Sequence, residues 1–548
     1  MNNPFLNCKN LLLAGLLIVS CAAAARAQYE NGSLNGTIHD ATGAAVANAT
    51  VTVTHISTGI VNKVVSNGSG DYEVPELRVG LYNVEAEAPG FAPAEAKNIT
   101  ISVGAREKID LTLKVGSADA TTVEVSDVSL QLETETSERG ETVSGYQTEA
   151  LPLVSRNYSD LLALVSGSRQ APTAATTTAV TSLVRAGAYN VNGLRSMFNN
   201  FLLDGMDNNA YGESNQGFDN QIIQPNPDAI AQFQVVTNNE SAEYGRSAGA
   251  TINVASKSGS NDLHVTLYEF NRNTDFNGFG YYHAVSGTHV FPKPGFNRNQ
   301  FGSDFGGPIY KNKLFFFLDY EGFRQTLTPT TVFTVPTENE LGIGTSTGTP
   351  VLVTDVQNPV TGQFFKAGTP IPAAAINPTS LQILKFFAAL PSQCLIAPGS
   401  NLISTSGGTD GLATNDCAVN APFTDDSDKG DLRIDFQESE KSSWFVKVSD
   451  RKETAINYNT EPEPLDGQAN GNGRIKILDQ QVALGYTRLI GTNKVLDARL
   501  ALSGTQAGKY SLAIGNNAIS IPGLPTVAAC NSPWARTSAS SRLTPSCG

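Results

Sequence analysis

The residue types that carry acid–base and metal chemistry are sparse in this chain of 548 residues. It has five histidines, and none lies in H-E-x-x-H or in a short His-x-x-Glu pair, the spacings that place zinc ligands on one face of a helix. A G-x-x-x-x-G-K-[ST] loop, which cradles phosphates, is also absent from the sequence. We therefore predict that the chain is not an enzyme and needs no cofactor or metal.

Acidic side chains are more common, and three of them could suggest a calcium site. Asp204, Asp207 and Asp219 fall in one stretch rich in Asn and Gly. They lack the spacing of an EF-hand loop and its glycine at the sixth position. The run from Asp425 to Asp428 fits a solvated turn ahead of a strand better than a metal site.

The composition favours β-structure with many turns. Charged residues make up 16% of the chain and hydrophobic residues 40%, with 50 glycines. β-Branched residues suit strands, whereas Gly, Asn and Ser suit the turns between them. The net charge of −14 argues against a nucleic acid as partner, because phosphate binding needs clustered Lys and Arg. The length allows about three or four domains.

The first 27 residues are typical of a secretory signal peptide. Lys9 precedes an apolar run that ends in an A-x-A-like cleavage site before Gln28. The run is short for a membrane anchor, which needs ~20 residues, and a lipoprotein signal with a lipidated Cys21 stays open as an alternative. Export permits disulfides, and Cys394 and Cys417 flank a polar stretch. This favours a disulfide that braces a surface loop over a metal site.

Residues 28–116 predict a small antiparallel β-sandwich. Turn signals separate stretches in which apolar residues alternate with period two. These stretches are residues 49–54, 81–86 and 108–113. Residues 36–43, 70–72 and Pro89-Gly90-Phe91 resemble the carboxypeptidase regulatory-like domain. The resemblance implies a non-catalytic, transthyretin-like sandwich that serves as a spacer, a docking domain or a sugar-binding module.

Residues 117–259, here called the plug region, predict a small α+β domain of short strands joined by Gly and Asn turns. The order N-G-x-R, L-D-G-x-D, A-E-Y-G and K-S-G-S-N resembles the plug of a TonB-dependent outer-membrane receptor. The first two motifs supply the plug-motif residues Asn192, Gly193, Arg195, Asp204, Gly205 and Asp207. Arg195 and Asp204 could form a ligand pair, but the resemblance favours charged side chains that face a polar lumen and hold the plug in place.

A short extended stretch precedes these motifs and holds Thr122, Val123, Glu124 and Val125. The resemblance implies that a segment at this place pairs with a TonB-type energy-coupling protein. The residues are equally compatible with an ordinary first strand of the plug.

Residues 260–527 contain about eight candidate strands in which apolar and polar residues alternate. Leu432, Ile434 and Phe436 share one face, and Asp431, Arg433 and Asp435 share the other. A soluble sheet has the same period, but nearby aromatic residues suit the interface girdles of a membrane barrel. In lipid such strands must close into a barrel. Residues 296–302 and 315–324 resemble the first barrel strands of Oar-like receptors.

A barrel that encloses a plug has ~22 strands and would need roughly 800 residues after the plug. The strands here are too few to close alone, and residues 528–548 lose the alternation. We expect that the sequence is the N-terminal portion of a longer receptor. Its aberrant or disordered tail would arise from a frameshift or a fragmentary gene.

These features predict a mainly β protein with an N-terminal transthyretin-like β-sandwich, a small α+β plug and a partial transmembrane antiparallel β-barrel. They predict a TonB-dependent receptor of the outer membrane whose N-terminal domain is periplasmic. Its partners would be the energy-coupling protein, outer-membrane lipid and a small-molecule or oligosaccharide ligand. The alternative is a carbohydrate-binding or adhesive protein of the cell surface or periplasm.

Overall fold

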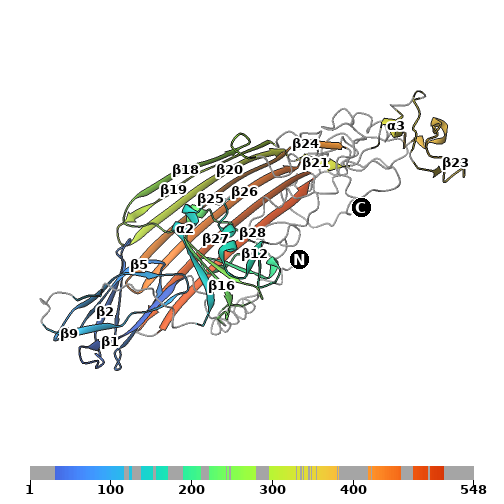
Figure 1. Ribbon diagram of the computed structural model, residues 1–548. Helices are drawn as coiled ribbons and strands as arrows, with labels where there is room; N and C mark the ends of the chain where they lie inside the picture. Colours follow the sequence, from blue (N-terminus) through green and yellow to red (C-terminus); the bar gives the residue numbers. More distant parts are fainter. Residues whose placement is uncertain are drawn as a thin grey trace, which may run out of the picture.

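The protein folds almost wholly into β-sheets, as the sequence predicts (Figure 1). The computed structural model describes most of residues 31–510, and the larger gaps are 117–122, 126–136, 171–188, 211–220, 279–294, 382–416 and 458–472. The predicted signal peptide and tail lie outside the described residues, as do Thr122, Asp219 and Cys394. Across the described ranges, no helix is long and apolar enough to cross a membrane.

Residues 31–116, here called the N-terminal domain, form two packed sheets. Their strand orders are β4-β1-β9-β6, with β8 also on β1, and β10-β7-β5-β2-β3. Alternate side chains of both sheets point inward and meet in one apolar core. The strands of this domain are β1 (Gly32–Asp40), β2 (Thr50–His55), β3 (Val61–Val65), β4 (Asp71–Leu77), β5 (Gly80–Glu87), β6 (Phe91–Ala92), β7 (Ala94–Ile101), β8 (Arg106–Lys108) and β9 (Leu111–Val115). The edge strand β10 (Val123–Val125) comes from the segment that follows the domain in the chain.

The predicted strand at residues 108–113 is broken in the structure. β8 ends at Lys108 and β9 begins at Leu111, and both pair in parallel with β1. Between them the Ile109 amide donates to the Asn35 carbonyl. A Cβ on Gly36 would lie 1.9 Å from the Ile109 carbonyl oxygen, so the chain can run this close to β1 only beside a glycine.

The plug region has its own five-stranded sheet, in the order β11-β16-β17-β14-β15, with short helices on one side. An apolar core joins the helices to the sheet, which is the predicted α+β arrangement. Its elements are β11 (Arg139–Ser144), α2 (Gly145–Ala150), η1 (Tyr158–Leu164), β12 (Ser168–Gln170), β13 (Tyr189–Val191), η2 (Ser196–Phe198), β14 (Asn200–Leu203), β15 (Met206–Asp207), η3 (Pro227–Ala229), β16 (Ile230–Asn238) and β17 (Thr251–Ser256).

Seven long antiparallel strands follow and form one sheet, here called the large sheet. They pair in the order β18-β19-β20-β25-β26-β27-β28. These strands are β18 (His264–Asn273), β19 (Gly295–Tyr310), β20 (Leu314–Thr328), β25 (Phe423–Ser439), β26 (Ser442–Asn457), β27 (Gly473–Ile490) and β28 (Lys494–Tyr510). Shorter elements lie in the connection between β20 and β25: β21 (Thr330–Phe333), α3 (Glu338–Leu341), β22 (Val356–Gln357), β23 (Phe364–Phe365), η5 (Ala373–Ala375) and β24 (Cys417–Asn420).

The two faces of the large sheet differ in polarity, and the predicted alternation is confirmed. One cross-strand row is apolar and 38–69% exposed, and its members are Leu318, Leu432, Val448, Val482 and Leu502. The neighbouring row on the opposite face is polar and at most 6% exposed, and it includes Asp319, Asp431, Ser449 and Gln481. An apolar face open to the surroundings and a polar face turned inward are typical of a strand wall in lipid.

The connections define two ends of the large sheet. The strands are joined at one end, beside the N-terminal domain, by short connections, residues 311–313, 440–441 and 491–493 (Figure 1). The connections at the opposite end are much longer. Outer-membrane barrels have short turns on the periplasmic side and long loops outside. Near the short turns, the rings of Trp444 and Tyr486 stack with centroids 4.0 Å apart, which suits an interface girdle.

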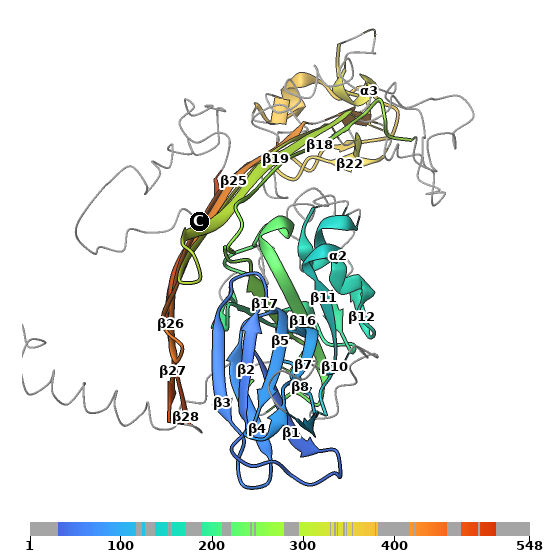
Figure 2. The same cartoon turned by 90° about the vertical axis from the view of Figure 1, so that its left-hand side faces the viewer.

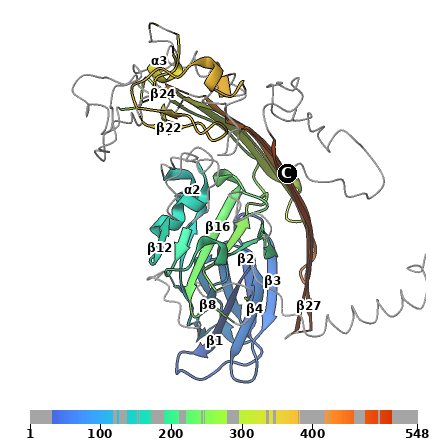
Figure 3. The ribbon, with the colours of Figure 1, turned by 90° about the vertical axis from the view of Figure 1, so that its right-hand side faces the viewer.

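The large sheet curves around the other two parts. Figure 2 shows the plug region and the N-terminal domain on its concave side, one above the other, and Figure 3 shows the same arrangement from the opposite side. The chain is closely packed where it leads from the plug region to the large sheet. A Cβ on Gly259 would lie 2.4 Å from the Phe316 carbonyl oxygen and 2.6 Å from that of Gly307. The glycine of the K-S-G-S-N motif therefore allows the chain to leave the plug region against the sheet wall.

The turn between β2 and β3 joins the N-terminal domain to the large sheet. Asn261 donates from its amide to the Ser57 carbonyl (2.9 Å) and from its side chain to the Thr58 carbonyl (2.7 Å). Asn261 also exchanges hydrogen bonds with Asn312 in the turn between β19 and β20. The last residue of the K-S-G-S-N motif thus ties three parts of the structure together.

A buried histidine supports this turn. His55 Nδ1 lies 2.7 Å from Thr58 Oγ1, and its ring packs on Tyr82 with centroids 4.7 Å apart. Burial, and then the nearby Arg78 charge, lower the pKa of His55 from 6.5 to about 4. The neutral ring is therefore the form that the folded domain accepts.

We predict that acid weakens this domain. A lowered folded-state pKa means that His55 contributes its full stabilisation above pH 6.5 and loses it as the pH falls toward 4, by on the order of 3 kcal/mol. Thermal unfolding of the chain measured between pH 7 and 4 should show this fall. His55→Gln should flatten the dependence, whereas His39→Gln should leave it in place. A His55→Gln profile that matches the wild type would contradict the prediction.

Candidate functional site between plug region and large sheet

The L-D-G-x-D motif forms a tight hairpin at the heart of the structure. Asp204 and Gly205 connect β14 to β15 and both have positive φ, 52° and 71°. A two-residue turn in which both residues have positive φ matches the twist of the two strands that it joins. Asp-Gly is a preferred pair for such a turn. This turn directs the Asp204 side chain toward the large sheet, where the side chain is fully buried.

The Asp204 carboxylate meets two cations of the large sheet. Arg433 Nη1 donates to Oδ1 at 2.9 Å, and Lys447 Nζ donates to Oδ2 at 3.1 Å. Ser256 of the plug region adds its amide and its hydroxyl, at 2.8–2.9 Å. Asp204, Arg433, Lys447 and Ser256 are each at most 9% exposed, so these groups are removed from water. Arg499 of β28 completes it by donating to the Asp204 carbonyl oxygen at 2.9 Å.

The charge network continues into the N-terminal domain. Arg433 also donates from Nε to Asp435, at 3.1 Å to Oδ2. Asp435 in turn forms a salt bridge with Arg78, whose Nη2 lies 3.0 Å from Oδ1. A series of alternating charges, Asp204, Arg433, Asp435 and Arg78, therefore links the plug region, the large sheet and the N-terminal domain.

A second polar contact lies nearby on the same wall. Lys447 lies 3.8 Å from Asp431, and Asp431 accepts a hydrogen bond from Ser449. Asn226 of the plug region, fully buried, donates to Asp319 of β20. Each plug-region group thus meets a complementary group on the inward face of the sheet.

Electrostatics keep Asp204 ionised. Burial alone would raise its pKa, but Lys447 and Arg433, followed by the Ser256 hydrogen bonds, hold the pKa well below the ordinary value. Buried opposite charges stabilise the fold only while each has its partner, because removal of one group leaves an uncompensated charge out of water.

The remaining plug-motif residues have local roles. Asn192 and Gly193, with φ of 51° and 80°, form the turn between Val191 and Leu194. The Asn192 side chain donates to the Thr237 carbonyl at 3.0 Å. Asp207 accepts hydrogen bonds from Asn209, at 2.8 Å from its side chain. Arg195 is exposed, and the cations that contact Asp204 are Arg433 and Lys447 rather than Arg195.

Sequence reasoning identified Asp204 but missed its partners. Arg433 was assigned to the polar face of its strand, yet alternation cannot tell which plug-region acid that face will meet. Ser256 lies in none of the motifs. Arg78 lies in a stretch, residues 77–82, that resembles the carboxypeptidase regulatory-like domain, but this resemblance does not predict its contact with Asp435. The lumen-facing cations within the alternating strands were the only clue in the sequence.

The predicted coupling segment lies on the N-terminal domain. Val123–Val125 form β10, which pairs in parallel with β7, whereas the sheet of the plug region begins with β11. An ordinary first strand of the plug sheet is therefore not what these residues form. The predicted disulfide involves Cys394, outside the described residues, so it stays a prediction.

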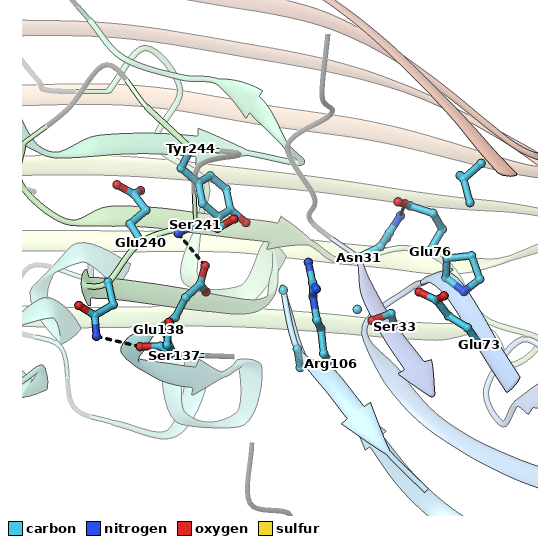
Figure 4. A pocket seen from close by; sticks show the side chains of 16 residues that line it. Asn31, Ser33, Glu73, Glu76, Arg106, Ser137, Glu138, Glu240, Ser241 and Tyr244 are labelled. Atoms are coloured by element: carbon cyan, nitrogen blue, oxygen red, sulfur yellow. Dashed lines mark hydrogen bonds between the residues drawn. The ribbon is translucent and has the colours of Figure 1, made fainter. Parts of the chain in front are cut away.

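A cavity of about 390 Å³ separates the N-terminal domain from the plug region (Figure 4). Its lining includes Glu73, Glu76, Arg106, Glu138 and Glu240. Direct hydrogen bonds between the two parts run through Gln232, which bonds to the Val103 amide (3.2 Å) and to Ser102 Oγ (3.1 Å). The seam is polar, unlike the apolar core on either side, as expected between separate domains.

This arrangement is suited to holding a domain in place rather than to catalysis. Within the described ranges, no group of three His, Cys, Asp or Glu side chains is placed to hold a metal ion. The carboxylate at the centre of the site is engaged by two cations and a serine, so it is not free to act as a base or nucleophile.

Three known domain families match this chain. Residues 255–545 match the outer membrane beta barrel domain, residues 134–252 the TonB-dependent receptor plug domain, and residues 33–114 the carboxypeptidase regulatory-like domain. The TonB-dependent transporter Oar of Myxococcus xanthus is 25% identical over 323 residues, which cover 57% of this chain and 28% of that protein. The chain thus spans less than a third of the length of this relative.

Solved structures of outer-membrane proteins are also similar. The outer membrane transporter YddB from Escherichia coli gives a TM-score of 0.40 at 14% identity, covering 66% of this chain and 38% of that one. A ferric enterobactin receptor mutant from Pseudomonas aeruginosa gives 0.38 at 10% identity, with 69% and 42% covered. The siderophore receptor PirA from Acinetobacter baumannii gives 0.36 at 14% identity, with 67% and 40% covered.

We predict that Asp204→Asn loosens the plug region from the large sheet. It leaves Arg433 and Lys447 buried without their shared carboxylate, which should cost about 3–5 kcal/mol. Urea titration of the purified chain in detergent, followed by proteolysis of the plug region, measures the loss.

Asp207→Asn is the matched control, because Asp207 accepts from Asn209 within its own turn. It should lose much less stability. Because the pKa of Asp204 is lowered, its stabilisation is present above the ordinary value of 3.8 and falls only below it. The gap between wild type and Asp204→Asn should therefore stay constant from pH 8 to 5. Equal losses in the two variants would refute the assignment.

Proposed function

The chain belongs to the family of outer-membrane β-barrel proteins, with a carboxypeptidase regulatory-like domain and a TonB-dependent receptor plug ahead of the barrel strands, and we propose that it works as a TonB-dependent uptake receptor. This family comprises transporters rather than enzymes, and its place is the outer membrane. The N-terminal domain would be periplasmic, since it lies at the end of the large sheet with the short turns.

The observation that carries the proposal is the buried contact of Asp204 with Arg433 and Lys447. It fixes the plug region against the inward face of the barrel wall, where the plug would block passage. A channel closed in this way opens only if work is done on the plug. The outer membrane has no energy source of its own, so an inner-membrane coupling protein has to supply that work through a segment that reaches into the periplasm. Residues 121–126 lie between the periplasmic domain and the plug, where such a segment is needed.

The same geometry supports a proposal for the ligand class. The inward face of the sheet carries many carboxylates and guanidinium groups, including Asp319, Asp431, Arg433 and Arg451. Such a wall suits a hydrophilic solute that is too large or too scarce for passive diffusion. We propose a small hydrophilic molecule or an oligosaccharide as the ligand.

Deletion of residues 121–126 tests this function. In the source organism, we expect the deletion to match a gene knockout in growth on the nutrient that the receptor imports, while the protein stays in the outer membrane at normal amount. A panel of oligosaccharides, peptides and ferric chelates, each as limiting nutrient, supplies the probes.

An equal deletion of residues 128–133 is the control and should retain growth, because it shortens the linker but keeps the coupling segment. If deletion of residues 121–126 leaves growth at the wild-type level on every nutrient that the knockout cannot use, the coupling role of this segment is wrong.

A further inference from the structure

The predicted coupling segment adds a strand to a sheet of the N-terminal domain, although it lies outside that domain in the chain. β10 lies after the last strand of the N-terminal domain and before the first strand of the plug sheet. It nevertheless pairs in parallel with β7, with Val123 beside Ala94, Glu124 beside Glu95 and Val125 beside Ala96. It thereby becomes the outermost strand of the sheet β10-β7-β5-β2-β3.

β10 pairs with the edge of β7 that faces away from β5. β7 is bonded to β5 on its other side, over Gly80–Ala86. Strand edges carry unpaired amide and carbonyl groups, and an extended peptide adds to such an edge through main-chain hydrogen bonds. The edge of β7 is therefore a built acceptor for one extended segment, and in this structure its occupant is Val123–Val125.

We propose, on the basis of the function above, that the β7 edge is a docking surface that holds the coupling segment away from the energy-coupling protein. A partner that captures the segment by strand addition competes with β7 for the same short stretch of backbone. The N-terminal domain then acts as an intramolecular competitor, and the receptor is engaged only when the segment leaves β7.

The docked state is built to be reversible. The pairing covers three residues and is parallel, the less stable of the two strand arrangements per residue. In the backbone register, Glu124 is paired with Glu95, and Glu95 is paired with Glu85. Like charges at facing positions weaken strand pairing. Burial, followed by the charges of Glu87 and Glu95, raises the pKa of Glu85.

Glu95 offers a way to change the pairing without disturbing the core. Its side chain is 23% exposed and lies 3.5 Å from Lys97, on the face of β7 opposite the buried Ala94 and Ala96. Substitutions at Glu95 therefore alter the edge while the apolar interior of the domain stays intact.

A reversible disulfide between β7 and β10 tests the proposal. In the full chain with its natural cysteines replaced by serine, Glu95→Cys with Glu124→Cys should cross-link on oxidation. Lys63→Cys with Glu124→Cys is the matched control and should not, because Lys63 lies on β3 at the opposite edge of the sheet, about 19 Å away at the usual strand spacing. The probe is the soluble periplasmic domain of the source organism's energy-coupling protein. Its binding should fall at least tenfold on oxidation and return on reduction.

The outcomes separate the two proposals. If no cross-link forms, or if the cross-linked chain binds as well as the reduced one, the docking proposal is overturned. If the cross-link forms but the reduced chain and the wild type bind no coupling domain, the coupling function is wrong, and the competitive role falls with it.

A second variant leaves the coupling segment itself unchanged. Glu95→Lys places an opposite charge beside Glu124, so it should strengthen docking and weaken binding of the coupling domain several-fold relative to Glu95→Gln. High salt should remove that difference. Equal binding by the two variants at low salt would count against the proposal.

Discussion

The structure depends on one buried carboxylate. Asp204 lies in the interior between plug region and large sheet, and its charge is tolerated only because Arg433, Lys447 and Ser256 surround it. Removing these groups from water costs free energy. Their mutual attraction offsets this desolvation energy only when all partners are in place. The plug region therefore has a single well-defined seat on the sheet, and that seat sets the positions of the hairpin, of β17 and of the inward face of β25 and β26.

The same constraint explains the unusual distribution of polarity in the large sheet. In a soluble protein the buried face of a sheet is apolar and the exposed face is polar. Here the exposed rows include Leu and Val, and the buried rows are rich in Asp, Arg, Lys and Gln, with Phe315 and Phe317 among them. This inversion is stable if the outer face meets hydrocarbon and the inner face meets a polar domain. The charges that seat the plug and the aliphatic side chains that face lipid are thus two consequences of one alternating sequence.

The sequence predicted the fold class and the faces of the strands well, because both depend on local patterns. Period-two alternation determines which side of β25 carries Leu432 and which carries Arg433, regardless of the partner. The break between β8 and β9 was missed, because apolar alternation continues through Ile109 although the strand is interrupted there, where the backbone lies close to Gly36. The partners of Asp204 were also beyond local reasoning. Arg433 and Lys447 are more than two hundred residues away in the chain, and only the seating of one domain against another brings them together.

The strengths of the contacts between the three parts imply an order in which they separate. The plug region is held to the wall by buried charges, whose separation would expose them in a poorly solvated space. The N-terminal domain is held by hydrogen bonds at exposed turns and by the Arg78–Asp435 pair, in which Arg78 keeps 23% of its side-chain surface in solvent. β10 is held by three residues of backbone. A force applied to the segment just before the plug therefore meets the weakest contact first, and β10 leaves β7 before the charges around Asp204 are strained. The contact with the fewest residues thus lies beside the linker to the plug region, and the most deeply buried contact lies between the plug region and the sheet wall.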